Sequence, residues 1–139
     1  LKKEIYKTYD ETDYTVYFSA NDSKILDKDF IEISEKMYFH HKKSKYLCNI
    51  YLGYIYSYNK VPFLKGNHSL LINNLSLSKK MEALDFLFKG AEKNDICSLV
   101  HLKEYYLSTQ DSINFNKYNI RLEQILLESK NKVNDSMEK

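Results

Sequence analysis

The chain has 139 residues, with 21 basic and 19 acidic side chains and a formal net charge of +2. This length predicts one domain with its own core. The near-balanced charge, with Arg121 the only arginine, disfavours a nucleic-acid binder, which would carry a basic stripe. Three glycines and one proline favour long helices over a turn-rich β-sandwich, and no apolar run is long enough to span a membrane.

Residues 1–22 are predicted to form an N-terminal arm. Residues 14–18 are β-forming, and the acidic segment 10–13 interrupts any helix before them. Asp22 and Ser23 are good N-cap residues, and apolar side chains then recur at helical spacing. These are Leu26, Phe30, Ile33 and Met37. The pattern predicts a helix over about 23–43.

A second helix is predicted over about 45–58, and it is apolar on nearly every side. Such a helix lies between neighbours rather than at a surface. Gly53 in its middle costs about 0.5–1 kcal/mol relative to alanine. We therefore expect an adjacent helix to approach closely at Gly53. Residues 23–58 form the first predicted helix pair.

Residues 59–78 are predicted to be an insertion. Val61-Pro62 and Gly66-Asn67 are turn signals. Its apolar residues are expected to pack onto the helices; they are Leu70, Leu71, Ile72 and Leu75.

A second helix pair is predicted over 79–107. Ser76 or Ser78 caps its first helix, Asn94 takes the left-handed conformation after it, and Asp95 caps the second helix from residue 96. A terminal capping helix follows over 112–133, with a polar tail from Lys130 that is expected to fray.

A short pattern occurs in both pairs. Its small, leucine and tyrosine positions are Cys48, Leu52 and Tyr56 in the first copy and Ser98, Leu102 and Tyr106 in the second. Before the second copy, Ala83 and the Gly90-Ala91 step precede the Asn94-Asp95 turn. The pattern resembles the SEL-one-like repeat, a relative of the tetratricopeptide repeat. The resemblance implies an all-α fold, a short right-handed α-α superhelix of two helix pairs with a capping helix.

The same resemblance implies a non-enzymatic protein-binding module, with one dedicated protein partner because the chain is small. An immunity or inhibitor protein that neutralises a toxin or enzyme is the alternative. Three tyrosines form a stripe beside the core stripe, and tyrosine is enriched at interface hot spots. They are Tyr51, Tyr54 and Tyr58. The other interpretation is that these rings pack within the protein.

The resemblance also places the first helix of each pair on the concave face. The candidate partner-binding residues there are Glu82, Asp85 and Lys89. A homodimer through the exposed edge of the last repeat is an alternative. The chain begins at Leu1 rather than methionine, so the compartment stays open, with the cytoplasm favoured and the periplasm or secretion as alternatives.

The sequence offers little sign of catalysis, so no catalytic residue, cofactor or metal site is predicted. Cys48 and Cys97 are expected to be buried free thiols, with a disulfide between repeats as the alternative. Cys97 and His101 lie four residues apart on one helix face, so a thiol-dependent enzyme is a less favoured alternative. Nucleic-acid binding is another, through Lys42, Lys43, Lys45, Lys79 and Lys80.

Overall fold

The computed structural model describes residues 28–61 and 67–138, and these residues form six α-helices and no strand. The helices are α3 (Lys28–His41), α4 (Lys45–Asn59), α5 (His68–Asn73), α6 (Leu77–Glu92), α7 (Ile96–Ser108) and α8 (Ser112–Glu138). The predicted all-α class is therefore confirmed for the described residues. The predicted arm over 1–22 and the N-cap at Asp22 and Ser23 lie outside them.

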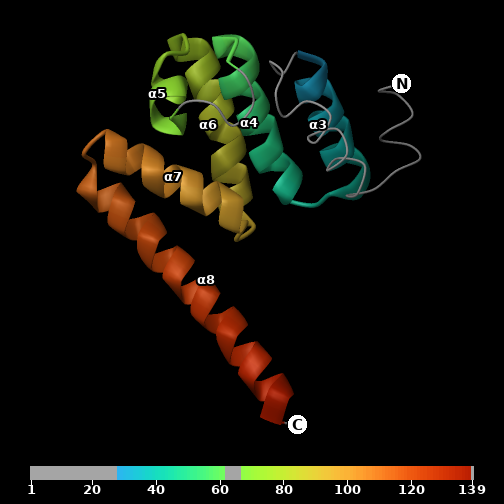
Figure 1. The fold of residues 1–139 in the computed structure, drawn as a ribbon, viewed down its shortest axis with the longest axis vertical. Coiled ribbons are helices and arrows are strands. Elements are labelled where there is room, and N and C mark those ends of the chain that lie inside the picture. The colour runs from blue at the N-terminus through green and yellow to red at the C-terminus, as the bar shows by residue number, and fades with distance from the viewer. Residues whose placement is uncertain (1–27, 62–66, 139) are drawn as a thin grey trace.

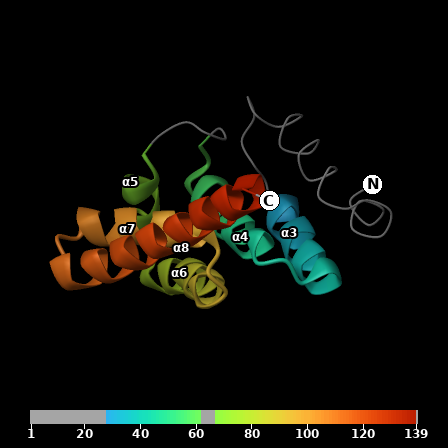
Figure 2. The same cartoon turned by 90° about the horizontal axis from the view of Figure 1, so that it is seen from below.

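The helices follow one another through space largely in chain order (Figure 1). α3 lies at one side against α4, α6 packs on α4, α7 packs on α6, and α8 packs on α7. The view from below shows the same order, with α3 and α7 on opposite sides of the molecule (Figure 2). Among the described residues, no helix combines the length and apolarity needed to cross a membrane.

Helix α4 lies at the centre of the core, as its all-round apolarity predicts. It contacts α3, α5, α6 and α7, and nine of its fifteen residues are buried. Gly53 faces α3, where an added Cβ would lie 2.9 Å from Ile31 Cγ1 and 3.0 Å from Phe30 Cδ1. The predicted close approach of a neighbouring helix at Gly53 is confirmed.

The second pair, α6 and α7, has the end signals that its sequence predicts. Ser76 rather than Ser78 caps α6, with its side chain accepting from Lys79 N at 3.3 Å. Asn94 has a φ of 60°. Asp95 Oδ2 accepts from Ser98 N at 3.0 Å and caps α7.

The insertion holds a short helix, α5, between α4 and α7. Leu71 and Ile72 are buried, but Leu70 is 65% exposed, so only part of this segment packs on the core as expected. Asn59 Nδ2 donates to Ile55 O and to Leu71 O, both at 2.7 Å, and this joins the end of α4 to α5.

Helix α8 is longer than the sequence predicts. Tyr118 and Leu122 are buried against the core and Ile125 is half-buried, and the Tyr118 ring stacks on Tyr106 of α7 with centroids 5.8 Å apart. The helix continues to Glu138, beyond the predicted end at residue 133, and the fraying of the polar tail from Lys130 stays a prediction. Its C-terminal half extends away from the other helices (Figure 1).

Candidate functional site

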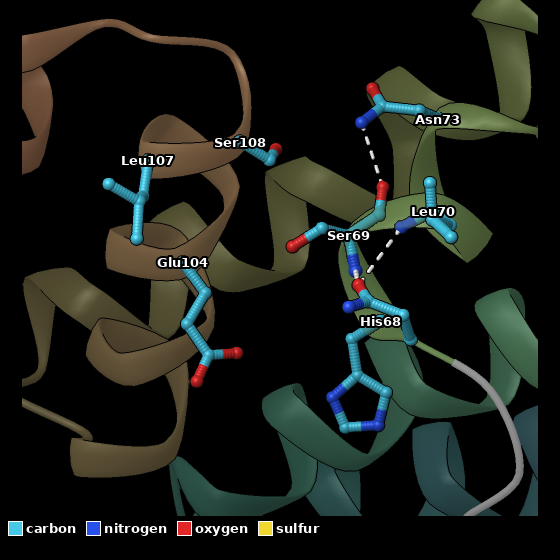
Figure 3. Close-up of a pocket in the computed structure, with 8 residues that line it drawn as sticks. His68, Ser69, Leu70, Asn73, Glu104, Leu107 and Ser108 are labelled. Atoms are coloured by element: carbon cyan, nitrogen blue, oxygen red, sulfur yellow. Dashed lines mark hydrogen bonds between the residues drawn. The ribbon is translucent and has the colours of Figure 1, made fainter.

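A pocket of about 610 Å³ opens between α5 and α7. Its lining residues are Asn67, His68, Ser69, Leu70, Asn73, Glu104, Leu107 and Ser108. The Glu104 carboxylate enters from α7 on one side, and the His68 ring comes from the start of α5 on the other (Figure 3). The polar end of the pocket thus combines an imidazole and a carboxylate.

A second histidine, His101, stands next to His68. The two ring centroids are 4.8 Å apart. His101 and Glu104 are three residues apart on α7, which places them on one face of that helix. One ligand atom from each of His68, His101 and Glu104 lies within 4.8 Å of the others. Two imidazoles and a carboxylate therefore converge from two helices.

Local hydrogen bonds fix the position of His68. Asn67 caps α5, with Oδ1 accepting from Ser69 N at 2.9 Å and from Leu70 N at 3.3 Å. Tyr56 of α4, which is fully buried, forms a 2.6 Å hydrogen bond between its hydroxyl and His68 Nε2. The His68 ring is therefore oriented by the core.

The His101 ring packs against other aromatic rings. Its ring lies 5.1 Å from that of Tyr51, and its buried Nδ1 has no hydrogen-bond partner among the described residues. Burial, with a smaller effect from nearby His68, lowers the pKa of His101 to about 4. Burial also lowers the pKa of His68, although Glu104 opposes that shift. Both imidazoles are therefore neutral at neutral pH.

The two cysteines form a disulfide, so the prediction of free thiols is wrong. Cys48 of α4 and Cys97 of α7 are bonded, with their Cα atoms 6.1 Å apart. The sequence shows two small buried positions, but only the packing of α7 beside α4 brings the sulfurs together. Cys97 is therefore not a thiolate nucleophile for the neighbouring His101 in this structure.

Two of the three candidate partner-binding tyrosines belong to the core. Tyr51 is 1% exposed and Tyr54 is 9% exposed, so their rings pack within the protein, which is the other interpretation given for this stripe. Burial, and next Glu82, raises the pKa of Tyr54 to about 12. Tyr58 is only half-buried and packs on Tyr54 with ring centroids 5.4 Å apart. Partner contact through Tyr58 stays a prediction.

The charged candidates Glu82, Asp85 and Lys89 are exposed on α6. Lys79 Nζ lies 3.2 Å from Glu82 Oε2, and Lys89 Nζ lies 3.0 Å from Asp85 Oδ2. Pairs this exposed are worth little to stability. Their charges are nevertheless balanced locally, so this face offers a partner little net electrostatic attraction. A binding role for it stays a prediction.

A second surface, which we call the α8 stripe, is apolar and exposed. It consists of Ile113, Ile120 and Leu127, which are 81%, 53% and 57% exposed. The three residues recur every seven positions, so they lie along one side of the helix. The spacing is visible in the sequence, but a second apolar stripe on the same helix, through Tyr118 and Leu122, is the one that the fold buries.

The histidine pocket was missed because its members are far apart in the sequence. His68 comes from the predicted insertion and His101 from a predicted repeat helix, and no spacing links them. The His101/Glu104 spacing on α7 was the one available signal.

Comparisons of the chain with protein-family models, with curated proteins and with solved structures found no match.

Proposed function

We propose that the two helix pairs are successive SEL-one-like repeats in a short right-handed superhelix, with α8 as the capping helix. The turns support this proposal. A residue with a left-handed backbone conformation follows each of the four helices that form the pairs, α3, α4, α6 and α7. These residues are Lys42, Lys60, Asn94 and Gln110, with φ between 55° and 61°. Non-glycine residues adopt this conformation uncommonly, so its recurrence at corresponding places favours a repeated unit.

Two links between the pairs support the same proposal. Lys93 Nζ lies 2.7 Å from Tyr38 Oη, and this joins the ends of α6 and α3. The Cys48–Cys97 disulfide joins the first turns of α4 and α7. The first helices of the two pairs, α3 and α6, are thus linked to each other, and so are the second helices, α4 and α7. Stacked repeats whose neighbours share one orientation have this arrangement.

On this scaffold we propose a non-enzymatic module that binds one dedicated protein partner. The α8 stripe is the observation that carries the proposal. Among the described residues α8 packs mainly on α7, and Ile113, Ile120 and Leu127 lie in solvent on its outer side. Surface apolar residues in line mark interaction sites more often than scattered ones do.

The occupant that fits the α8 stripe is an amphipathic helix from the partner protein. Such a helix would continue the stack by packing on α8 as α8 packs on α7. Apolar residues at i and i+7 are among the anchors through which an amphipathic helix is bound. Exposed polar side chains such as Lys117, Glu123 and Glu128 border the stripe and carry both charge signs, so they would form the rim of the interface.

The test compares the wild-type chain with Ile120→Glu/Leu127→Glu in affinity capture from the source organism. The captured protein is then purified and its affinity is measured by calorimetry. We expect one stoichiometric partner and at least about a 100-fold weaker affinity for the variant, because two buried charges would face an apolar helix. Phe39→Glu is the matched control, since Phe39 is 74% exposed on α3.

Equal affinity for the variant and the wild type would show that the α8 stripe is not the site. A monomeric chain that captures no protein would overturn the proposal. A dimer that dissociates in the Ile120→Glu/Leu127→Glu variant would replace the dedicated partner with a second copy of the chain. If the partner is a toxin or enzyme, loss of its activity on mixing would establish the inhibitor version.

The disulfide bears on where such a module works. Disulfides persist in secreted and periplasmic proteins and are rare in the reducing cytosol. The bond between Cys48 and Cys97 therefore supports the periplasmic or secreted alternative over the cytoplasm. Mass spectrometry of protein taken directly from cells tests this, because a bridged chain gains two hydrogens on reduction. An unchanged mass would show that the two cysteines are reduced in cells and would favour the cytosol instead.

A further inference from the structure

We propose that His68, His101 and Glu104 form a binding site for a divalent transition metal ion, with zinc as the best fit. Their ligand atoms lie within 4.8 Å of one another. The ligands therefore need only small side-chain rotations to reach a common ion, since Zn–N and Zn–O bonds are about 2.0–2.2 Å long. This site is independent of the α8 stripe.

The donor set indicates the metal. Imidazole suits zinc, copper, iron and nickel, whereas calcium and magnesium select oxygen donors alone. Two histidines and one glutamate are the protein ligands of a known type of zinc site, which keeps a further position open. Here His68 and Glu104 also line the 610 Å³ pocket. Water or a small anionic ligand entering the pocket would complete the coordination.

The protein orients the ligands as a metal site requires. Metal-binding histidines usually engage their second nitrogen with a protein group, which fixes the ring and its tautomer. Tyr56 does this for His68 through Nε2 at 2.6 Å, so Nδ1 is the nitrogen left for the ion. Tyr56 is fully buried, and the ring it orients is correspondingly fixed.

His101 gives a second, independent indication. Its Nδ1 is buried without a hydrogen-bond partner among the described residues, although the ring is packed against Tyr51 and His68. A buried polar atom without a partner destabilises the folded protein, and native structures rarely contain one. An ion bound through Nδ1 would supply the partner that this atom lacks, because a neutral imidazole nitrogen is a common metal ligand.

A competing donor group also includes His101. Atoms of Cys48, Cys97 and His101 also lie within 4.8 Å of one another. The two sulfurs are bonded to each other, and a metal would need them as thiolates. The oxidised protein therefore has the two histidines and Glu104 as its ligands, and the thiol group becomes a distinct alternative that the experiment separates.

The test uses the intact, oxidised chain after treatment with a chelator. Zn²⁺ binding is measured by calorimetry, and Co²⁺ is added separately as a spectroscopic probe of the ligands. We expect one Zn²⁺ per chain and a Co²⁺ spectrum of nitrogen and oxygen ligands without the near-ultraviolet band that cobalt–thiolate bonds give. His68→Ala and Glu104→Gln should weaken Zn²⁺ binding by more than about 100-fold, and Tyr56→Phe by about 10–100-fold.

Two controls keep the result interpretable. His40→Ala removes an exposed histidine on α3, far along the chain from the site, and should leave the affinity unchanged. Glu104 is exposed on α7, so Glu104→Gln should retain the wild-type circular dichroism spectrum and melting temperature without metal. A loss of binding in this variant is then a loss of a ligand rather than of the fold.

Three outcomes would overturn the proposal. The first is no stoichiometric Zn²⁺ binding by the wild type. The second is equal binding by the wild type and Glu104→Gln. The third is a Co²⁺ complex that forms only after reduction and shows the cobalt–thiolate band, which would assign the ion to the Cys48, Cys97 and His101 group instead.

Discussion

The two helix pairs, α3–α4 and α6–α7, both bring their helices into close contact, but the glycine that permits this lies on opposite members. In the first pair, Gly53 is on the second helix and faces Phe30 and Ile31 of α3. In the second pair, Gly90 is on the first helix and faces Ser98 of α7. The same close packing is therefore reached with a large neighbour in one pair and a small, hydrogen-bonded neighbour in the other.

The buried positions of the two first helices show why. Helix α3 buries Phe30, Ile31, Ser34 and Met37, and α6 buries Ala83, Leu84, Leu87 and Gly90. Both sets follow the same helical spacing, but α3 has bulky side chains at its first and last positions where α6 has small ones. In the first pair the bulky side chains are on α3, so the space for them has to come from α4, at Gly53. In the second pair the small side chains on α6 allow α7 to pack closely.

The disulfide joins the two pairs, and its removal should have the largest effect. Cys48→Ala/Cys97→Ala opens a link between residues 49 apart in sequence. Loss of a bridge of this span should lower the free energy of unfolding by about 4 kcal/mol, because the unfolded chain regains its freedom. Urea denaturation of the variant and the wild type measures the difference. The mass of the wild type first confirms that its disulfide is formed. If the variant then has the same free energy of unfolding as this oxidised wild type, the prediction is contradicted.

The two glycines should respond differently to alanine. An added Cβ at Gly90 would lie 2.0 Å from Ser98 Oγ and 2.8 Å from Ser98 Cβ. Gly90→Ala should therefore destabilise the protein by about 1–3 kcal/mol. Gly53→Ala should cost less, because the atoms it meets belong to longer side chains that can shift and because alanine favours the helix. Thermal melts of both variants test the order, and a lower melting temperature for Gly53→Ala would reverse it.

The N-caps of the two second helices give a smaller contrast. Asp95 Oδ2 accepts from Ser98 N at 3.0 Å and from Ser98 Oγ at 2.6 Å at the start of α7. Ser44 at the start of α4 makes no side-chain cap hydrogen bond. Asp95→Ala should cost about 1 kcal/mol, whereas Ser44→Ala should be close to neutral. Chemical denaturation of the two variants would contradict this if Ser44→Ala were the more damaging.

The left-handed residues after the first helices should show the smallest effect, with opposite signs. Lys42 has a φ of 57°, which glycine tolerates better than lysine, so Lys42→Gly should raise stability by up to about 1 kcal/mol. Asn94 Oδ1 accepts from Arg121 Nε at 3.0 Å and from Arg121 Nη2 at 2.7 Å. Asn94→Gly loses these exposed bonds and should lower stability by about 0.5 kcal/mol. A stabilising effect of Asn94→Gly in the same denaturation experiment would remove the contrast.

Local signals in the sequence were enough to place the helix ends of the second pair. Asn94 and Asp95 act through backbone and capping hydrogen bonds within a few residues, so their roles are set before the chain packs. The apolar surround of α4 also predicted its burial. Gly53 indicated a close neighbour, although the sequence could not say that the neighbour was α3.

The candidate site depended more strongly on packing. Tyrosine has an apolar ring and a polar hydroxyl, so it occurs both in protein cores and at interfaces. The sequence therefore could not say which of the two environments Tyr51 and Tyr54 occupy. Only the positions of α6 and α7 bury them. The exposed charges of Glu82, Asp85 and Lys89 were predictable, because long charged side chains remain in solvent on any helix of this kind.

The sequence by itself determined that this protein is helical, where most of its helices begin and end, and which helix lies deepest. Periodicity and end signals act over a few residues and are therefore readable in order along the chain. The tertiary structure alone decided that Cys48 meets Cys97, that His68 meets His101 and Glu104, and that one side of α8 stays bare. Each of these depends on how helices distant in sequence are placed in space, and side-chain spacing within one helix carries no information about that placement.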